Sequence, residues 1–343
     1  MQFHEMEIPR KILLGSCILE RIQKVCKDLN LEDQLVINDA ITRNIAGESV
    51  SDSLRSENLI IEKAEYKEVE GVVEYIKEND CRSLIAVGGG SVIDTGKLAS
   101  FTAKIPFVSV PTTASHDGMA SSRASVVKDG KKTSFEAHTP IAVVADTNVI
   151  VQAPYRFLAA GCGDLIANYT AVKDWELAYR LRNDYYSEYA ASLSLMSAKL
   201  MIENAETIKE GLEESVRKVV KGSISSGVAM SIAGTSRPAS GSEHLFSHAL
   251  DRIAEKPALH GEQCGVGSII MMYLHGGNWR EIQGALRAVK APTNAEELGL
   301  SEEEVIEALI MAPTIRDRYT ILGEKKLKKR VATKMTRKTG VID

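Results

Sequence analysis

Along the first 150 residues, apolar residues follow two different spacings in turn. Short runs rich in valine and isoleucine are typical of buried strands, and segments with apolar residues at helical spacing lie between them. In residues 66–79, for example, Val69, Val73 and Ile76 fall on one helix face. Strands that alternate with helices predict a parallel sheet covered on both faces. The expected strands are residues 34–38, 58–61, 83–87, 106–110 and 141–145.

Residues 122–135 interrupt this alternation and predict a β-hairpin. Two short runs with valine, threonine and phenylalanine flank the pair Asp129-Gly130. An Asp-Gly pair is a common two-residue turn between antiparallel strands. We therefore expect a hairpin here rather than another crossover helix.

Beyond Pro154 the apolar residues recur at helical spacing almost throughout, and β-branched runs are few. Helices are expected at residues 155–181, 185–210 and 216–233. We place a domain boundary near residue 150, between an α/β domain (1–150) and an all-helical domain (151–343). A cleft between two domains is where ligands most often bind.

Composition excludes several classes of protein. Of the 343 residues 44% are hydrophobic and 26% charged, and a net charge of −4 argues against a chain built to bind nucleic acid. No apolar run reaches the roughly 18 residues that span a bilayer, and the first residues lack the apolar stretch of a signal peptide. Five scattered cysteines, Cys162 and Cys264 among them, are interpreted as packing residues of a cytoplasmic protein.

A glycine-rich turn follows the strand expected at 83–87. The string Gly88-Gly89-Gly90-Ser91 leads into a helical segment that contains Asp94. Glycines let the backbone approach a phosphate closely, and a helix N-terminus offers unpaired N–H groups to an anion. The string matches neither the dinucleotide fingerprint nor the P-loop. It predicts a pyrophosphate site, with a tight turn capped by Ser91 as the alternative.

Polar residues also follow two other expected strands. The strand at 106–110 leads into a loop with Thr112, Thr113 and Ser115, and open α/β sheets bind ligands at such carboxyl ends. Asp39 follows the strand at 34–38, where a carboxylate can meet an adenosine ribose, although Asn-Asp is also ordinary turn chemistry. We expect a nucleotide along this edge of the sheet.

Three histidines and one aspartate carry metal-ligand chemistry. His244 and His248 are four residues apart, so on a helix they project from the same face. With His260 and Asp164 they offer imidazoles and a carboxylate, which suit a divalent ion such as zinc with one coordination position left open. Spacing alone leaves open whether one or both of the first two histidines bind the ion.

These strings together resemble a known superfamily. Residues 88–97, residues 111–115, Asp164 and the later histidines are similar to the metal-dependent polyol dehydrogenases, which include glycerol dehydrogenase, iron-containing alcohol dehydrogenases and 3-dehydroquinate synthase. Residues 115–125 and 236–244 are most similar to the archaeal sn-glycerol-1-phosphate dehydrogenase branch. The resemblance covers nearly the whole chain. It implies a dehydroquinate synthase-like fold, in which a Rossmann-like α/β domain binds the dinucleotide and an all-α domain holds metal and substrate.

The resemblance also implies roles for particular residues. Asp164, His244 and His260 resemble the three protein ligands of a catalytic zinc ion. Asn168 stands where the iron-containing branch has a further histidine, which favours zinc over iron. Asp117 and His248 resemble substrate contacts, with Asp164 touching substrate as well, and His248 or a water linked to Asp117 is the expected proton relay. The expected cofactor-binding residues are Asp39, Gly88, Gly89, Gly90, Ser91, Val92, Ile93, Asp94, Thr112, Thr113, Ala114, Ser115 and Ser121.

The implied activity is the reversible reduction of dihydroxyacetone phosphate to sn-glycerol 1-phosphate by NADH or NADPH, with Zn²⁺ as the metal. We expect Arg237, or else Arg123, to bind the substrate phosphate. We also expect a homo-oligomer without a nucleic-acid partner. The alternatives are a dehydrogenase of unphosphorylated glycerol, a sugar-phosphate cyclase like 3-dehydroquinate synthase, and a non-catalytic nucleotide- or metal-binding protein.

Overall fold

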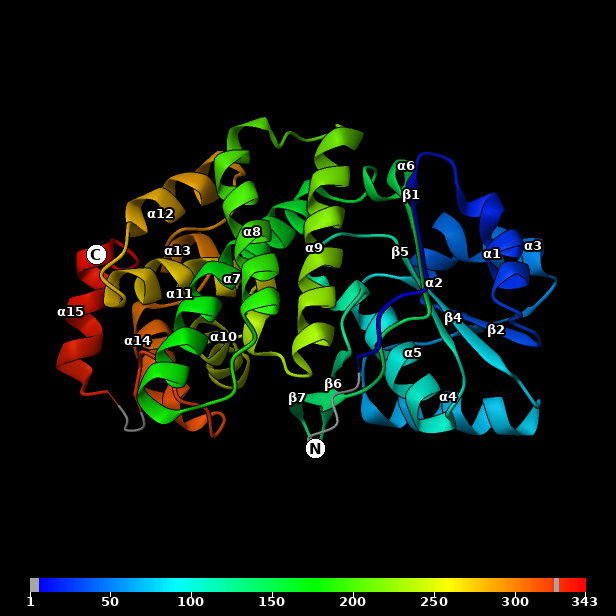
Figure 1. The fold of residues 1–343 in the computed structure, drawn as a ribbon, viewed down its shortest axis with the longest axis horizontal. Helices are drawn as coiled ribbons and strands as arrows, with labels where there is room; N and C mark the ends of the chain where they lie inside the picture. The colour runs from blue at the N-terminus through cyan, green and yellow to red at the C-terminus, as the bar shows by residue number, and fades with distance from the viewer. Residues whose placement is uncertain (1–5, 324–326) are drawn as a thin grey trace.

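A parallel six-stranded sheet forms the centre of the first half of the chain (Figure 1). The computed structural model describes residues 6–323 and 327–343, and the counts below refer to these residues. The strand order is β1-β8-β5-β4-β2-β3, and every neighbouring pair is parallel. The strands are β1 (Lys11–Gly15), β2 (Gln34–Asn38), β3 (Glu57–Ile60), β4 (Ser83–Gly88), β5 (Phe107–Pro111) and β8 (Ala142–Asp146).

All five expected strands are present, with ends that differ by at most one residue. The strand that the pattern missed is β1, which lies at the edge of the sheet beside β8. Its residues are only partly buried, so it lacks the continuous apolar run of a central strand.

Alternate residues of the strands pack against helices on the two faces of the sheet. Leu35 and Leu84 belong to one buried cluster, with side chains of α4 (Tyr66–Glu78) and α5 (Gly90–Ala103). Val36 and Ile85 belong to a cluster on the other face, with side chains of α1 (Ile22–Asp28) and α3 (Glu48–Leu54). The expected parallel sheet with both faces covered is confirmed. Shorter helical segments here are η1 (Leu19–Arg21), α2 (Ala40–Thr42), η2 (Arg43–Gly47) and η3 (Asp117–Met119).

The expected hairpin is also present as β6 (Arg123–Lys128) paired with β7 (Lys131–Glu136). Asp129 and Gly130 both have positive φ, at 52° and 71°. Positive φ at both central residues is the geometry of the turn that suits the twist of antiparallel strands.

From residue 147 onward every assigned element of the described residues is helical. The helix expected at 185–210 is shorter than its pattern, because α8 ends at Glu203 and a separate turn follows it. The elements are α6 (Thr147–Ile150), α7 (Tyr155–Arg182), α8 (Glu188–Glu203), η4 (Ala205–Thr207), α9 (Glu213–Ala233), η5 (Arg237–Ala239), α10 (Ser242–Ile253), α11 (His260–Leu274), α12 (Trp279–Ala288), α13 (Ala295–Leu298), α14 (Glu302–Met311), η6 (Ala312–Thr314) and α15 (Lys329–Thr339).

Helices α7 and α11 approach each other closely near the candidate metal-binding residues. A side chain on Gly261 of α11 would meet the carbonyl oxygen of Ala160 at 1.9 Å, and one on Gly163 of α7 would meet the carbonyl oxygen of Gly261 at 2.4 Å. Only glycine fits at either contact. This contact brings Asp164 on α7 beside His260 at the start of α11.

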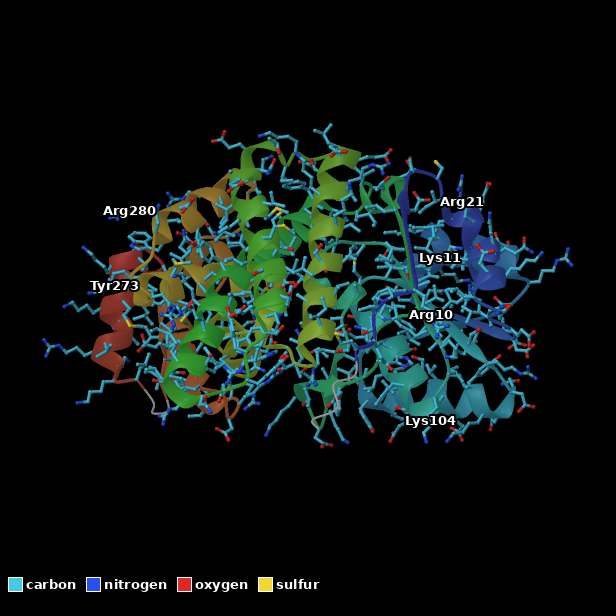
Figure 2. All side chains as sticks on the ribbon, viewed as in Figure 1. Arg10, Lys11, Arg21, Lys104, Tyr273 and Arg280 are labelled. Carbon is cyan, nitrogen blue, oxygen red and sulfur yellow. The ribbon has the colours of Figure 1, made fainter. Side chains whose placement is uncertain are left out.

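Side chains fill the space between the helical layers, and basic residues such as Arg21, Lys104 and Arg280 extend outward (Figure 2). Among the described residues, no helix combines the length and the apolar character needed to cross a membrane.

Candidate active site

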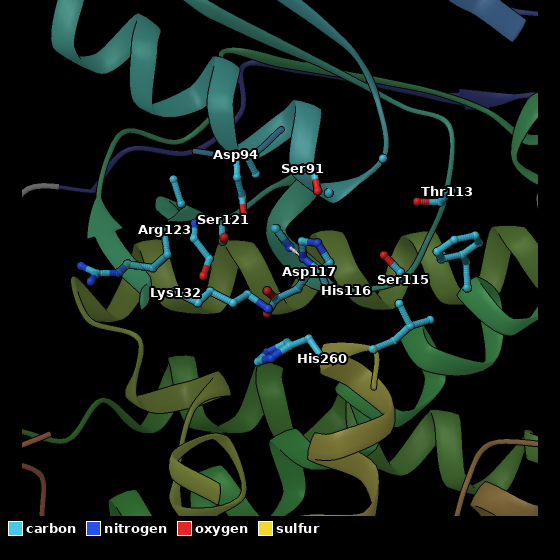
Figure 3. Close-up of a pocket in the computed structure, with 18 of the residues that line it drawn as sticks. Ser91, Asp94, Thr113, Ser115, His116, Asp117, Ser121, Arg123, Lys132 and His260 are labelled. Carbon is cyan, nitrogen blue, oxygen red and sulfur yellow. Dashed lines mark hydrogen bonds between the residues drawn. The ribbon is translucent and has the colours of Figure 1, made fainter. Parts of the chain in front are cut away.

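A cavity of about 900 Å³ lies between the sheet half and the helical half (Figure 3). We call its lining residues from 39 to 134 the sheet wall and those from 149 to 316 the helical wall. The sheet wall follows the carboxyl ends of β2, β4 and β5, where an open parallel sheet offers a ligand site.

Two side chains of the helical wall, His244 and His260, come together with the buried side chains of Asp164 and Cys264, and all four carry metal-binding atoms. One ligand atom each of Asp164, His244, His260 and Cys264 lies within 4.8 Å of the other three. The Nε2 atoms of both histidines are 3.7 Å from Oδ1 of Asp164. A carboxylate and two imidazole nitrogens at this separation can be bridged by one divalent ion, so the donor set fits Zn²⁺.

The opposite nitrogen of each imidazole has a hydrogen-bond partner of its own. Nδ1 of His244 lies 2.9 Å from Oε1 of Glu243, and Nδ1 of His260 lies 3.0 Å from Oγ of Ser247. The Ser247 hydroxyl donates to Gln263, so its oxygen accepts the Nδ1 proton of His260. These contacts place the unshared pairs of both rings on Nε2, toward Asp164.

Cys264 is the member of this group that the sequence did not reveal. It lies one helical turn after His260 and is completely buried, with Sγ 3.7 Å from Nε2 of His260. The i to i+4 spacing on α11 was a usable signal, but free cysteines near a ligand are more often packing residues.

Burial, helped by a neighbouring carboxylate, raises the pKa of Asp164 to about 7. Burial also lowers the pKa of His260 well below its usual value, so this ring stays neutral. Burial alone would lower the pKa of His244, but Cys264 and Glu243 outweigh it and raise that pKa well above the usual value. A divalent cation would be bound by the ionised Asp164 and the neutral His244, so metal binding releases protons here.

On the sheet wall the helix α5 begins directly after the glycine string. Its N-cap is Gly89, which supplies no side-chain hydrogen bond, and Ser91 lies inside the helix rather than capping it. The alternative of a turn capped by Ser91 is therefore wrong. The first N–H groups of α5 lack a side-chain acceptor from the cap, which fits a bound phosphate.

Nine of the thirteen expected cofactor residues line the cavity, and four do not. Gly88 is buried under Val92, since a side chain on Gly88 would meet Val92 at 2.6 Å. Val92 and Ile93 belong to the core of the sheet half, and Ala114 belongs to the core of the helical half. The nine that line the cavity are Asp39, Gly89, Gly90, Ser91, Asp94, Thr112, Thr113, Ser115 and Ser121.

Lys97, one turn beyond Asp94, is completely buried and had not been singled out. Its amino group lies 3.4 Å from Asp94 Oδ1 and donates to the carbonyl oxygens of Gly118 (2.5 Å) and Arg123 (2.7 Å). Asp94 Oδ2 in turn accepts from the backbone N–H of Ser125. This network fixes both the loop after β5 and the hairpin to the helix that begins at the glycine string.

Asp117 lies between the two walls. Its backbone N–H donates to Oδ2 of Asp164 at 2.9 Å, and its carboxylate accepts from the Ser226 hydroxyl at 2.7 Å. The Asn168 amide donates to the same hydroxyl rather than lying in the metal-binding group. Asn168 thus supports Asp117 through Ser226.

The expectation that Arg237 binds the substrate phosphate is wrong, because this side chain lies outside the cavity. Its guanidinium donates to the carbonyl oxygen of Tyr319 at 2.8 Å and pairs with Asp184, and it does not line the cavity. Arg123 does line it, together with Lys132 and Arg316, which the sequence did not suggest.

The fold is the one found in solved glycerol dehydrogenases. A solved glycerol dehydrogenase from Schizosaccharomyces pombe matches with a TM-score of 0.79 at 21% identity, covering 100% of this chain and 94% of its own. A probable glycerol dehydrogenase from Sinorhizobium meliloti matches with a TM-score of 0.80 at 19% identity, covering 99% and 100%. The iron-containing alcohol dehydrogenase family matches residues 14–154.

Curated relatives are far more similar in sequence. The glycerol-1-phosphate dehydrogenase [NAD(P)+] of Thermococcus sibiricus is 57% identical over 100% of this chain and 99% of its own length. That of Methanosarcina mazei is 56% identical over 98% and 97%. The chain therefore belongs to the glycerol-1-phosphate dehydrogenase family, and the resemblance seen in the sequence is confirmed.

Proposed function

We propose that this protein catalyses the NAD(P)H-dependent, zinc-dependent and reversible reduction of dihydroxyacetone phosphate to sn-glycerol 1-phosphate. The observation that carries the proposal is that Asp164, His244 and His260 converge, with both histidines lining a cavity that Gly89 and Gly90 also line. The names of relatives more than 50% identical over the full length support this reaction over glycerol oxidation or sugar-phosphate cyclisation. In archaea the product would be the glycerol backbone of membrane phospholipids.

The helical wall would hold the metal. Asp164, His244 and His260 are the proposed ligands, and a zinc ion with three protein ligands keeps one position open for substrate. A zinc ion bound there would polarise the substrate carbonyl and stabilise the negative charge that develops on its oxygen. Glu243 and Ser247 hold the two imidazoles in the orientation that this requires.

The sheet wall would hold the dinucleotide. The N-terminus of α5 at Gly89 and Gly90 would bind the pyrophosphate, and the loop from Thr112 to Ser115 would lie against the nicotinamide half. Asp39 would face the adenosine ribose. Its Oδ1 caps α2 by accepting from the N–H groups of Ile41 and Thr42, so the carboxylate is fixed in place at the cavity.

The proton for the product alkoxide would come from a water held by Asp117, or would pass through His248 acting as a relay that takes up a proton from water at one ring nitrogen as it gives one up from the other. Burial lowers the pKa of His248 to about 4, so its ring is neutral near pH 7. Its Nε2 lies 3.3 Å from the Arg316 guanidinium, a donor only, so Nε2 accepts and the ring proton is on Nδ1. His248 and Asp117 both line the cavity beside His244 and His260, as substrate contacts require.

We further propose that the chain divides near residue 150 into a dinucleotide-binding domain and a metal- and substrate-binding domain. The change from strands to helices at α6 supports this boundary. A cytoplasmic location and a homo-oligomeric state are also part of the proposal. The scattered free cysteines support the location.

The test is an assay of the zinc-loaded protein with dihydroxyacetone phosphate and each reduced cofactor, followed by chiral analysis of the product. We expect consumption of NADH or NADPH and formation of the sn-1 isomer. Unphosphorylated dihydroxyacetone should react much more slowly. Faster turnover of that compound, or product formation without net oxidation of the cofactor, would contradict the proposal.

A further inference from the structure

Two basic side chains of the hairpin and one from the distant helical half line the cavity. They are Arg123 at the start of β6, Lys132 on β7 and Arg316 just after η6. Arg123 and Lys132 lie on the side of the cavity away from Thr113, and the Lys132 side chain extends toward Asp117 and His260 (Figure 3). All three are half-buried.

The two arginines in this group lack the partners that arginines elsewhere in the protein have. Arg156 and Arg237 each pair with a carboxylate. The Arg316 guanidinium instead lies against the neutral ring of His248, at 3.3 Å. Arg123 donates weakly to Ser134, at 3.3 to 3.4 Å. Within residues 6–323 and 327–343, neither Arg123 nor Arg316 has a carboxylate oxygen within 4.0 Å.

Placing Arg123 and Arg316 near each other, neither of them paired with a carboxylate, is unfavourable in the absence of an anion. Burial lowers the pKa of Arg316, and the nearby charges of Arg123 and Arg252 lower it further. Burial also lowers the pKa of Arg318 to about 9, with contributions from Arg237 and Arg316. Partly dehydrated like charges repel one another, and an anion that binds among them relieves both costs. A guanidinium offers phosphate oxygens two parallel hydrogen bonds.

Resting on the proposed function, we propose that Arg316, Arg123 and Lys132 form the subsite for the phosphate dianion of the substrate, with Arg316 as its main contact. Arg316 touches His248, whose ring centroid is 5.8 Å from that of the proposed zinc ligand His260. An anion at Arg316 therefore places the rest of a three-carbon substrate next to the metal-binding group. Lys132 forms an ion pair at 3.3 Å with the buried carboxylate of Asp251, which also lies 3.9 Å from Nδ1 of His248. Its charge is therefore close to this point but partly balanced, so we expect its contribution to be the smallest of the three.

The first experiment compares Arg316→Gln with the wild type in steady-state kinetics. Loss of a charged hydrogen-bonding partner should raise KM for dihydroxyacetone phosphate by about 10- to 100-fold. The kcat/KM for unphosphorylated dihydroxyacetone, KM for NADH and NADPH, and zinc content should change by less than about threefold. Arg280→Gln, a change at an exposed arginine on α12, is the matched control and should leave all of these values unchanged.

The second experiment is independent of turnover. Inorganic phosphate is titrated calorimetrically into the zinc-loaded wild type and into Arg316→Gln, and the difference between the two removes any binding to the metal itself. We expect at least about tenfold weaker binding by the variant. If the wild type fails to reduce dihydroxyacetone phosphate but shows this difference, the proposed function is wrong and the anion subsite stands.

Three results would overturn the subsite. Equal losses with phosphorylated and unphosphorylated substrates would make Arg316 a general structural residue. A rise in KM for NADPH alone would assign the cations to the cofactor's 2′-phosphate. Unchanged phosphate binding, with zinc content intact, would leave Arg316 without a role in anion recognition.

Discussion

The two walls of the cavity offer different chemical groups to a ligand. The part of the sheet wall proposed to hold the dinucleotide offers mainly backbone and small side chains, such as Gly89, Gly90 and Thr113, whereas the charged side chains of Arg123 and Lys132 lie on the side of the cavity away from Thr113 (Figure 3). At the helical wall the proposed metal ligands are titratable side chains from three helices, with His244 and His260 lining the cavity and Asp164 buried beside them. A wall of backbone recognises a ligand by shape, so one substitution weakens it. A ligand set of three side chains has no redundancy, so one substitution should abolish it.

The largest effect that this contrast predicts is for His244→Ala. Loss of one imidazole from the three proposed ligands should reduce turnover by at least about 10³-fold and remove most of the bound zinc. The fold should persist, since the core of the helical half is formed by many other side chains. Metal analysis, kinetics and cooperative thermal unfolding of the same preparation provide the check. A variant with full zinc content and full activity would remove the metal assignment.

The sheet wall should respond more mildly, and Gly89→Ala tests this. A side chain at Gly89 would lie 3.5 Å from the Thr113 hydroxyl, an ordinary contact, but it would occupy space next to the N-terminus of α5. We expect KM for NADH and NADPH to rise about tenfold with unchanged zinc content and unfolding temperature.

Gly90→Ala is the informative comparison for that variant. A side chain at Gly90 would overlap Nε2 of His116 at 2.1 Å, so this variant should lose stability as well as cofactor binding. Equal behaviour of Gly89→Ala and Gly90→Ala would show that steric fit rather than approach to the cofactor governs the loop.

A smaller effect on zinc content and kcat is expected for a substitution of Cys264. This variant tests whether the metal has three protein ligands or four. If Asp164, His244 and His260 suffice, Cys264→Ser should keep its zinc and change kcat by less than about threefold. Four protein ligands would close the coordination sphere, as in structural zinc sites, and leave no position for substrate. Loss of zinc from Cys264→Ser would therefore require a different account of the helical wall.

The sequence predicted the central strands of the sheet better than its edge strand β1. Central strands such as β4 and β5 are buried on both faces and read as continuous apolar runs, whereas β1 at the edge is only partly buried. The helix ends were less predictable than the helices, since α8 stops at Glu203 although apolar residues continue beyond it.

For the site, the sequence predicted which neighbouring residues line the cavity better than which distant ones do. Gly89, Gly90 and the polar loop after β5 line it as expected. Arg237 and Arg316 look alike in the sequence, and only packing decides that the first pairs with Asp184 while the second lines the cavity. The role of Lys97 depends on the carbonyl groups of Gly118 and Arg123, which no pattern places beside it.

The smallest predicted effect concerns acid sensitivity in the sheet half, away from the metal group. Burial, with the nearby charge of Lys97, lowers the pKa of His138 to about 4, below the usual value of 6.5. The unfolded chain therefore binds more protons between pH 6.5 and 4, so the neutral ring stabilises the fold above pH 6.5 and this contribution disappears as the pH falls to 4. His138→Gln removes the titration while an amide can replace the hydrogen bond to the Ser100 hydroxyl.

Urea unfolding of zinc-loaded wild type and His138→Gln, at pH 7 and pH 5, measures this contribution. Since His138 is partly exposed, the wild type should lose only about 1 kcal/mol more than the variant between these two pH values. The zinc ligands are the same in both proteins, so their own titration cancels in the difference. Parallel stability curves would mean that His138 contributes nothing to the acid sensitivity of the protein.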